Sequence, residues 1–203
     1  MNLNNQIAKT VFALFFVFFG TLQTQAQVTF KPGLRGGANF SHFTKGNYYY
    51  SNSIPNDVSY GTHTDFYLGF YGALKLSKYY TLQPEFDYSA QGSNYRTANS
   101  GSINFNVDYF SVEVLNKFTF NDQFNIHFGP TLDFVVSKDF NTQSDVDMDF
   151  VLGAGYNFTP NFGIEARVKK GIIPVFYSDI DNTNTNHTNV VFSLGATYTF
   201  DVK

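Results

Sequence analysis

The 203-residue sequence has no cysteine, no tryptophan and few charges. Without cysteine the chain can form no disulfide, no Cys-ligated zinc or iron–sulfur site, no thiol nucleophile and no Cys-linked lipid anchor. Charged residues make up 14% of the chain, whereas about 25% is usual in a soluble domain. The net charge of −3 and the lack of a basic run also argue against a nucleic-acid-binding protein.

Aromatic residues are abundant instead. The chain has 25 phenylalanines and 14 tyrosines, and aromatics make up 19% of its residues. A disordered chain would show the opposite pattern, with few aromatics and a high net charge. A sequence so aromatic and so poorly charged is expected to present part of its surface to an environment other than water.

The opening segment, residues 1–26, is typical of a secretory signal peptide. Lys9 provides a positive charge, and a mainly apolar run of 12 residues follows it. The small residues Thr24 and Ala26 predict cleavage between Ala26 and Gln27. The alternative is a membrane anchor, but a spanning helix needs about 20 apolar residues. Beyond this segment no apolar run approaches that length.

The rest of the chain, residues 27–203, alternates between apolar and polar residues with the period of a β-strand. Strands of about 10 residues or more suit a tilted membrane crossing better than a soluble sheet, where about 5–6 residues are usual. The predicted strands cover residues 28–42, 64–77, 80–90, 107–119, 124–137, 147–158, 162–176 and 189–201.

The two faces of these strands differ sharply in charge. Even-numbered positions in their central parts carry no charged residue. The odd-numbered positions carry many glycines, hydroxyl residues and amides, together with most of the charges of this region. These charged residues are Arg35, Lys75, Glu85, Asp87, Glu113, Lys117, Asp133, Asp149, Glu165, Arg167 and Lys169.

This pattern predicts an all-β fold, an eight-stranded antiparallel up-and-down transmembrane β-barrel in the outer membrane. Lipid cannot satisfy backbone polar groups, so a membrane sheet must close on itself. The connections between strands also alternate between short and long, as periplasmic turns and outer loops do. The alternative is a soluble β-sandwich, which would place its charged face in water. The short links are residues 78–79, 120–123 and 159–161, and the long ones are 43–63, 91–106, 138–146 and 177–188.

Four strings resemble the small outer-membrane β-barrel family labelled porin-family or PorT-like. They are GLRGGANFS (33–41), LQPEFDYS (82–89), GPTL (129–132) and FSLGATYTF (192–200). The resemblance implies an eight-stranded barrel that is inserted into outer-membrane lipid by the outer-membrane assembly machinery. The last string resembles the assembly signal, through Phe192, Leu194, Tyr198 and Phe200. The chain departs from the family where three residues follow Phe200, and at Glu113, where relatives tend to have proline.

Charged side chains in the lumen are the main candidate site. The interior of an eight-stranded barrel is just wide enough for side chains to fill, so charges there need partners. We expect a network near mid-membrane. One interpretation is an ion-pair plug that closes the barrel, and the other is a narrow ion path gated by the same groups. The network residues are Arg35, Glu85, Asp87, Glu113 and Arg167.

Histidine is the main candidate for catalysis. The chain has four, His42, His63, His127 and His187, and His127 is expected to face the lumen with Asp133. A lipid-acting barrel enzyme would need a hydroxyl or a carboxyl beside the histidine, such as Ser137 or Glu113. No hydrolase or zinc-protease spacing supports this, and a histidine that fills the lumen is the preferred interpretation.

Acidic residues cluster in two of the predicted outer loops. Oxygen ligands of this kind suit a hard cation, but neither cluster has the spacing of a calcium loop, and solvated loops are the preferred interpretation. No cofactor or metal is expected. The clusters are Asp139, Asp145, Asp147 and Asp149, and the segment 179–184.

The sequence therefore predicts a non-enzymatic protein that acts through its outer loops in binding, adhesion or envelope support. The first of these loops carries Tyr48, Tyr49 and Tyr50, which suit stacking or the interfacial aromatic belt. A narrow pore or transport protein is the main alternative, and a lipid-acting enzyme is the other.

Overall fold

A computed structural model describes residues 28–44, 59–97, 101–121, 123–139, 144–173, 176–178 and 185–201. The predicted signal peptide, its cleavage site at Ala26 and Gln27, the tyrosines 48–50 and the acidic segment 179–184 lie outside these ranges. Within them, no helix is long and apolar enough to cross a membrane.

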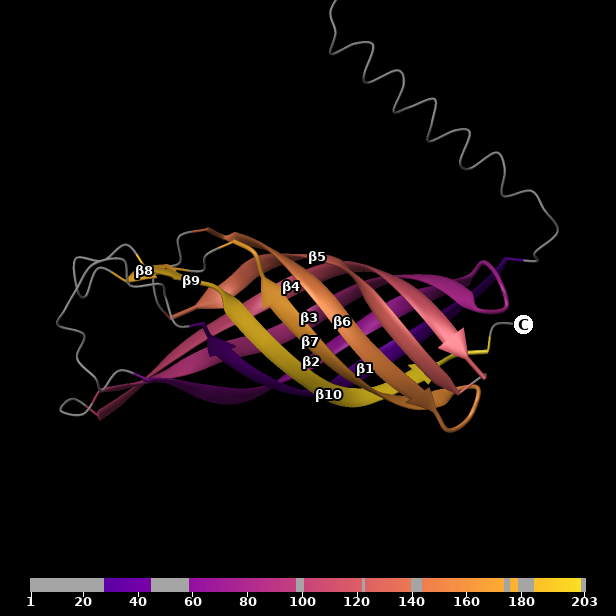
Figure 1. The fold of residues 1–203 in the computed structure, drawn as a ribbon, viewed down its shortest axis with the longest axis horizontal. Coiled ribbons are helices and arrows are strands. Elements are labelled where there is room, and N and C mark those ends of the chain that lie inside the picture. Colours follow the sequence, from indigo (N-terminus) through magenta and orange to yellow (C-terminus); the bar gives the residue numbers. More distant parts are fainter. Residues whose placement is uncertain are drawn as a thin grey trace, which may run out of the picture.

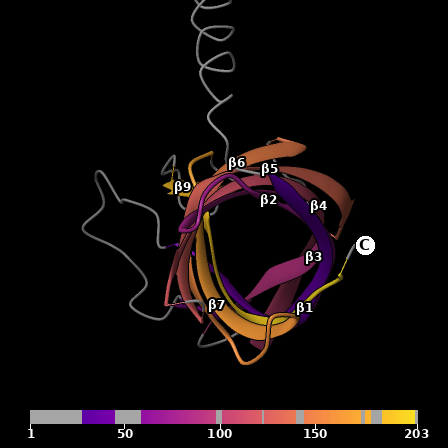
Figure 2. The same ribbon diagram turned by 90° about the vertical axis from the view of Figure 1, so that its right-hand side faces the viewer.

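The described strands form a closed antiparallel barrel of eight strands and a separate two-stranded ribbon, β8–β9 (Figures 1 and 2). The barrel order is β1-β10-β7-β6-β5-β4-β3-β2, so β1 pairs with both β2 and the last strand. This confirms the predicted fold class and excludes a sandwich. The bounds are β1 Thr29–Phe43, β2 Ser59–Lys75, β3 Tyr80–Thr97, β4 Gly101–Phe120, β5 Phe124–Lys138, β6 Val146–Asn157, β7 Phe162–Gly171, β8 Phe176–Ser178, β9 Thr185–His187 and β10 Asn189–Thr199.

The two faces of the strands point in and out as the alternation predicts. Even-numbered apolar residues cover the outside, with Leu68 61% and Leu152 55% exposed. Odd-numbered polar residues are enclosed, with Glu85 and Ser111 both 0% exposed. Aromatic rings pack against each other on the outer face, for example Phe118 and Phe128 with centroids 5.9 Å apart. The molecule is apolar outside and polar inside, the inverse of a soluble domain.

Short turns lie at the end of the barrel where both β1 begins and β10 ends (Figure 1). The Ser77 hydroxyl accepts hydrogen bonds from two backbone N–H groups in the first turn, and the Thr159 hydroxyl does the same in the third. In the second turn, Asn121 adopts a positive φ of 44°, a conformation that asparagine tolerates better than most residues. These turns are expected to face the periplasm.

The connection between β3 and β4 differs from the prediction. Residues 91–106 were expected to form a long loop, but β3 continues to Thr97 and β4 starts at Gly101, paired directly across the hairpin. In the β4 part of this extension the apolar residues change to odd numbers, because Ile103, Phe105 and Val107 alternate with Ser102, Asn104 and Asn106. The even-numbered apolar face therefore does not continue into the hairpin, and the search for that face missed the extension. The strand predicted over 162–176 also ends earlier, at Gly171.

Candidate functional site

The strand register brings the predicted lumen charges into one layer. Arg35 on β1, Gly69 on β2 and Asp87 on β3 are successive register partners. Gly69 has no side chain, so the guanidinium of Arg35 crosses above it to reach Asp87. A Cβ at Gly69 would overlap Asp87 Oδ1 and lie 2.6 Å from the carbonyl oxygen of Phe86. The close approach of this ion pair therefore requires glycine at position 69.

Arg35 binds three carboxylates. It pairs with Asp87 through Nη1, and the same nitrogen lies 3.4 Å from Glu85 Oε2. Its Nε donates to Glu165 Oε1 at 2.8 Å. The guanidinium also lies over the ring of Tyr67, 4.4 Å from the centroid.

Arg167 approaches the same carboxylates from β7. Its two terminal nitrogens donate to both oxygens of Glu85, at 2.6 and 2.9 Å. They also reach Glu113 Oε2 at 3.1 Å and Glu165 Oε2 at 2.9 Å. Glu85 and Glu165 therefore bridge the two arginines, while Glu113 is bound to Arg167.

The structure thus places all five predicted network residues within one hydrogen-bonded cluster, each no more than 5% exposed. Sequence reasoning left two members out. Glu165 was assigned to the inward face but not to the network, although it lies two residues from Arg167 on the same face. Tyr67, whose hydroxyl donates to Glu165 Oε1 at 3.4 Å, carries no charge to mark it.

A second cluster lies further toward the outer loops. Lys169 pairs with Asp133, lies 3.7 Å from Asp149 Oδ2, and contacts the Ser111 hydroxyl at 3.5 Å. The Thr131 hydroxyl donates to Asp133 Oδ1 at 3.0 Å. Asp133, Asp149 and Lys169 are each at most 7% exposed, so the buried charges continue beyond the central network.

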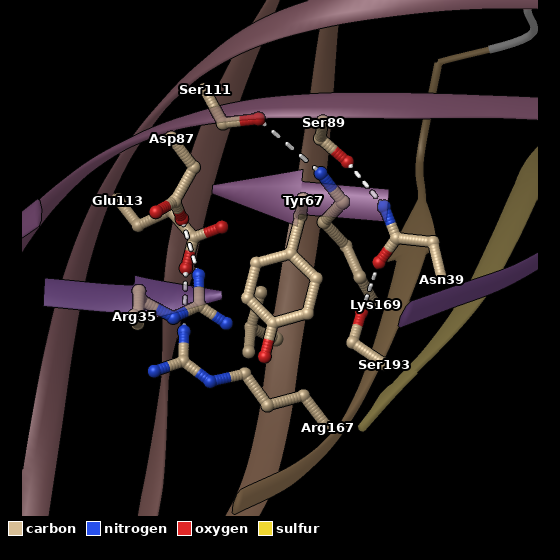
Figure 3. Close-up of a pocket in the computed structure, with 11 residues that line it drawn as sticks. Arg35, Asn39, Tyr67, Asp87, Ser89, Ser111, Glu113, Arg167, Lys169 and Ser193 are labelled. Atoms are coloured by element: carbon tan, nitrogen blue, oxygen red, sulfur yellow. Dashed lines mark hydrogen bonds and ion pairs between the residues drawn. The ribbon is translucent and has the colours of Figure 1, made fainter. Parts of the chain in front are cut away.

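Little space remains between the two clusters. Figure 3 shows side chains from several strands that point toward one another. The cavity that they enclose has a volume of about 20 Å³, which is room for about one water molecule. Its lining includes Arg35, Asp87, Glu113, Arg167 and Lys169.

Carboxylate oxygens of Glu85, Asp87 and Glu113 lie within 4.8 Å of one another, a spacing that a metal ion accepts. Each of the three carboxylates already contacts a guanidinium. A cation at their centre would have to compete with two arginines for the same oxygens. The arrangement therefore favours an ion-pair network over a metal centre.

The predicted acidic loop does not form one cluster. Asp139 accepts hydrogen bonds from the backbone and the side chain of Asn106, at 2.9 and 2.8 Å. Asp145 pairs with Lys138 at 2.6 Å. Asp147 and Asp149 belong to β6 and are buried in the lumen. The expectation of a solvated loop therefore fails for these last two residues, because β6 begins at Val146 and turns them inward.

His127 is 2% exposed, and its Nδ1 lies 3.1 Å from Asn125 Oδ1. Ser137 lies ten residues along the same strand, which is about 33 Å in an extended chain, so the two cannot form a dyad. Among the described residues, no hydroxyl or carboxylate is hydrogen-bonded to this imidazole.

The terminal strand presents its assembly-signal-like residues to the outside. Phe192, Leu194, Tyr198 and Phe200 are between 40% and 50% exposed. Just beyond them, Asp201 accepts from the Asn161 amide at 3.0 Å and pairs with Lys31 at 3.1 Å. These two partners hold the pKa of Asp201 below its usual value.

A closed eight-stranded barrel with an apolar exterior and a polar, filled lumen defines an outer-membrane β-barrel protein. The comparisons agree: the chain belongs to the outer membrane protein beta-barrel domain family, whose model matches residues 12–200. It lies in the lipid bilayer of the outer membrane. A search of curated protein sequences found no match.

Solved structures of other outer-membrane barrels resemble the fold. The outer membrane protein OprG from Pseudomonas aeruginosa is 11% identical with a TM-score of 0.50, over 86% of this chain and 98% of OprG. Neisserial surface protein A is 16% identical with a TM-score of 0.51, over 83% of this chain and 97% of that protein. At these identities the likeness concerns the fold alone.

Proposed function

We propose that the chain is a non-enzymatic outer-membrane barrel whose lumen is plugged by ion pairs, and that it acts through its outer loops in binding, adhesion or envelope support. The observation that carries this proposal is the central cavity of about 20 Å³. A hydrated ion needs a continuous path wider than a single water. Arg35 and Arg167 both line this cavity and share the carboxylates of Glu85 and Glu165, which supports a closed lumen.

Charge pairing supports a permanent plug. Desolvated charges are costly unless they are paired and hydrogen-bonded, and each arginine here binds three carboxylates. Opening a path would separate several of these pairs at once. The network therefore favours one rigid arrangement over a gate that opens readily.

The outer end of the barrel carries two elements that are available to contact a partner. The hairpin of β3 and β4 extends beyond the β4–β5 pairing, which starts at Val107. The β8–β9 ribbon lies at the same end of the barrel (Figure 1). Insertion would follow the usual route, with the outward residues of β10 read by the assembly machinery.

Single-channel recording in planar bilayers tests the plug. The wild-type protein should show almost no conductance, and Arg167→Ala should raise it, because that change removes the side chain that spans the lumen. Lys170→Ala is the matched control, since Lys170 lies on the outer face of the same strand. Large regular channels in the wild type would show that the protein is a pore. Raised conductance in Arg35→Met with unchanged stability would indicate a gated path.

A further inference from the structure

A second, larger cavity opens at the short-turn end of the barrel, the end that faces the viewer in Figure 2. Its volume is about 420 Å³, within the range of about 300–1,000 Å³ that is typical of small-molecule sites. Residues from both ends of the chain line it, since Lys31 lies on β1 and Thr199 on β10. We call this cavity the vestibule.

Three lysines line the vestibule, Lys31, Lys75 and Lys117. Lys75 on β2, Thr81 on β3 and Lys117 on β4 are successive register partners. Their odd numbers place all of them on the inward face. The lysines therefore converge because of the strand register, whereas the sequence separates them by more than forty residues at each step.

Few carboxylates balance these lysines. Among the described residues that line the vestibule, none is an aspartate or a glutamate. Lys117 donates to Gln83 Oε1 at 3.4 Å, and Lys75 has no ion pair within the described part of the chain. Lys31 pairs with Asp201 at the open rim, where both side chains are partly exposed. Lys75, which is exposed at the end of β2, and Lys117 therefore add positive charge to a lining that has no carboxylate.

An alternative role for these lysines is to balance the buried carboxylates of the central network. That network has two arginines and four carboxylates, so it is formally negative. Gln83 separates it from the vestibule, because its amide nitrogen donates to Glu85 Oε1 at 2.6 Å while its oxygen accepts from Lys117. The ammonium of Lys117 is thus one residue removed from the carboxylates, and its remaining donors are available to a ligand.

We infer that the vestibule binds a small, multiply charged, phosphate-bearing anion from the periplasm. Ammonium groups bind phosphate as point charges, and the hydroxyls of Thr81, Thr119 and Thr199 add neutral donors to the lining. This route rests on the plug proposed above: with the inner end closed, the ligand enters and leaves on the periplasmic side. Lipid headgroups surround the barrel on its outside, whereas the vestibule lies within the ring of strands.

Titration with inorganic pyrophosphate tests this inference. The refolded protein is held in a non-ionic detergent without phosphate, and binding is measured by calorimetry and by amide NMR shifts of Thr81 and Lys117. Saturable binding is expected, and higher salt should weaken it. The double variant Lys75→Gln, Lys117→Gln should bind pyrophosphate about tenfold more weakly or worse, because charge-assisted hydrogen bonds are lost. Lys117→Arg keeps the charge and should retain most of the affinity.

Lys78→Gln is the matched control. Lys78 lies in the adjacent turn and stacks over the Tyr79 ring, with its Nζ 5.3 Å from the centroid, and it does not line the vestibule. Its loss should leave the affinity within about twofold. Absence of saturable binding, or equal affinity in the double variant and the wild type, would overturn the inference. Loss of barrel stability in the double variant without weaker binding would assign the lysines to charge balance alone.

A further titration, with phospholipid present, distinguishes a free phosphate-bearing anion from a lipid headgroup as the ligand. Adding phosphatidylglycerol to the micelles should leave pyrophosphate binding unchanged. If the lipid displaces pyrophosphate and shifts the same amides, the site takes a headgroup, and the assignment to a free periplasmic anion is wrong.

Discussion

Arg35 is the residue whose removal is expected to disturb the lumen most cleanly. It contacts Asp87, Glu85 and Glu165. Arg35→Met leaves buried carboxylates with only Arg167 as a central cation, and we expect it to lower the free energy of unfolding by about 3–5 kcal/mol. Combining Asp87→Asn with Arg35→Met should recover part of this loss of stability, because it removes the carboxylate that faces position 35. Urea unfolding in lipid vesicles measures both singles and the double.

An interaction energy near zero in this cycle would mean that Arg35 and Asp87 are not coupled. Lys170→Met is the control, since it also removes a cation but from the outer face. Its effect on unfolding should be small. Glu113 is a poorer partner for such a cycle, because it is bound to Arg167 at 3.1 Å.

At the scale of the strand, the outward face should respond to charge according to depth. Leu68 lies in the middle part of β2 and is 61% exposed to the outside. Leu68→Arg should destabilise the folded barrel by about 2–4 kcal/mol, because the guanidinium enters the lipid midplane. Leu132→Arg on β5 should destabilise the folded barrel by a similar amount. Unfolding in vesicles is the measurement.

Val136→Arg is the control for depth. Val136 also points outward on β5 but lies two residues from its outer end, where an arginine should cost only about 0–1 kcal/mol. Equal, small effects at all three sites would show that this face does not meet the lipid core.

At the scale of the whole molecule, cleavage of the predicted signal peptide can be tested directly. We propose that the mature protein begins at Gln27, on the basis of the small residues at positions 24 and 26. Intact-mass spectrometry of the protein from outer-membrane fractions should give the mass of residues 27–203. Retention of Met1 in that fraction would contradict cleavage and would remove the basis for the secretory interpretation.

Alternation alone determined the class of fold and the orientation of most side chains. A period of two assigns each residue to one face, and the middle of a lipid-facing surface disfavours charge, so the odd-numbered charges near the strand centres were expected inside. Leu68, Glu85 and Arg167 all lie where this rule places them. The β3–β4 hairpin was the exception, because its apolar residues in β4, Ile103, Phe105 and Val107, fall on odd numbers and do not continue the even-numbered outer face.

The tertiary structure decided which inward residues meet. Register and barrel closure place Arg35 across Gly69 from Asp87, and set Lys75 and Lys117 on either side of Thr81. Neither relation follows from the one-dimensional pattern, because a shift of two residues between strands keeps every side chain on its face but changes all its partners. The sequence by itself therefore determined the faces of this barrel, and only the closed sheet decided the contacts inside it.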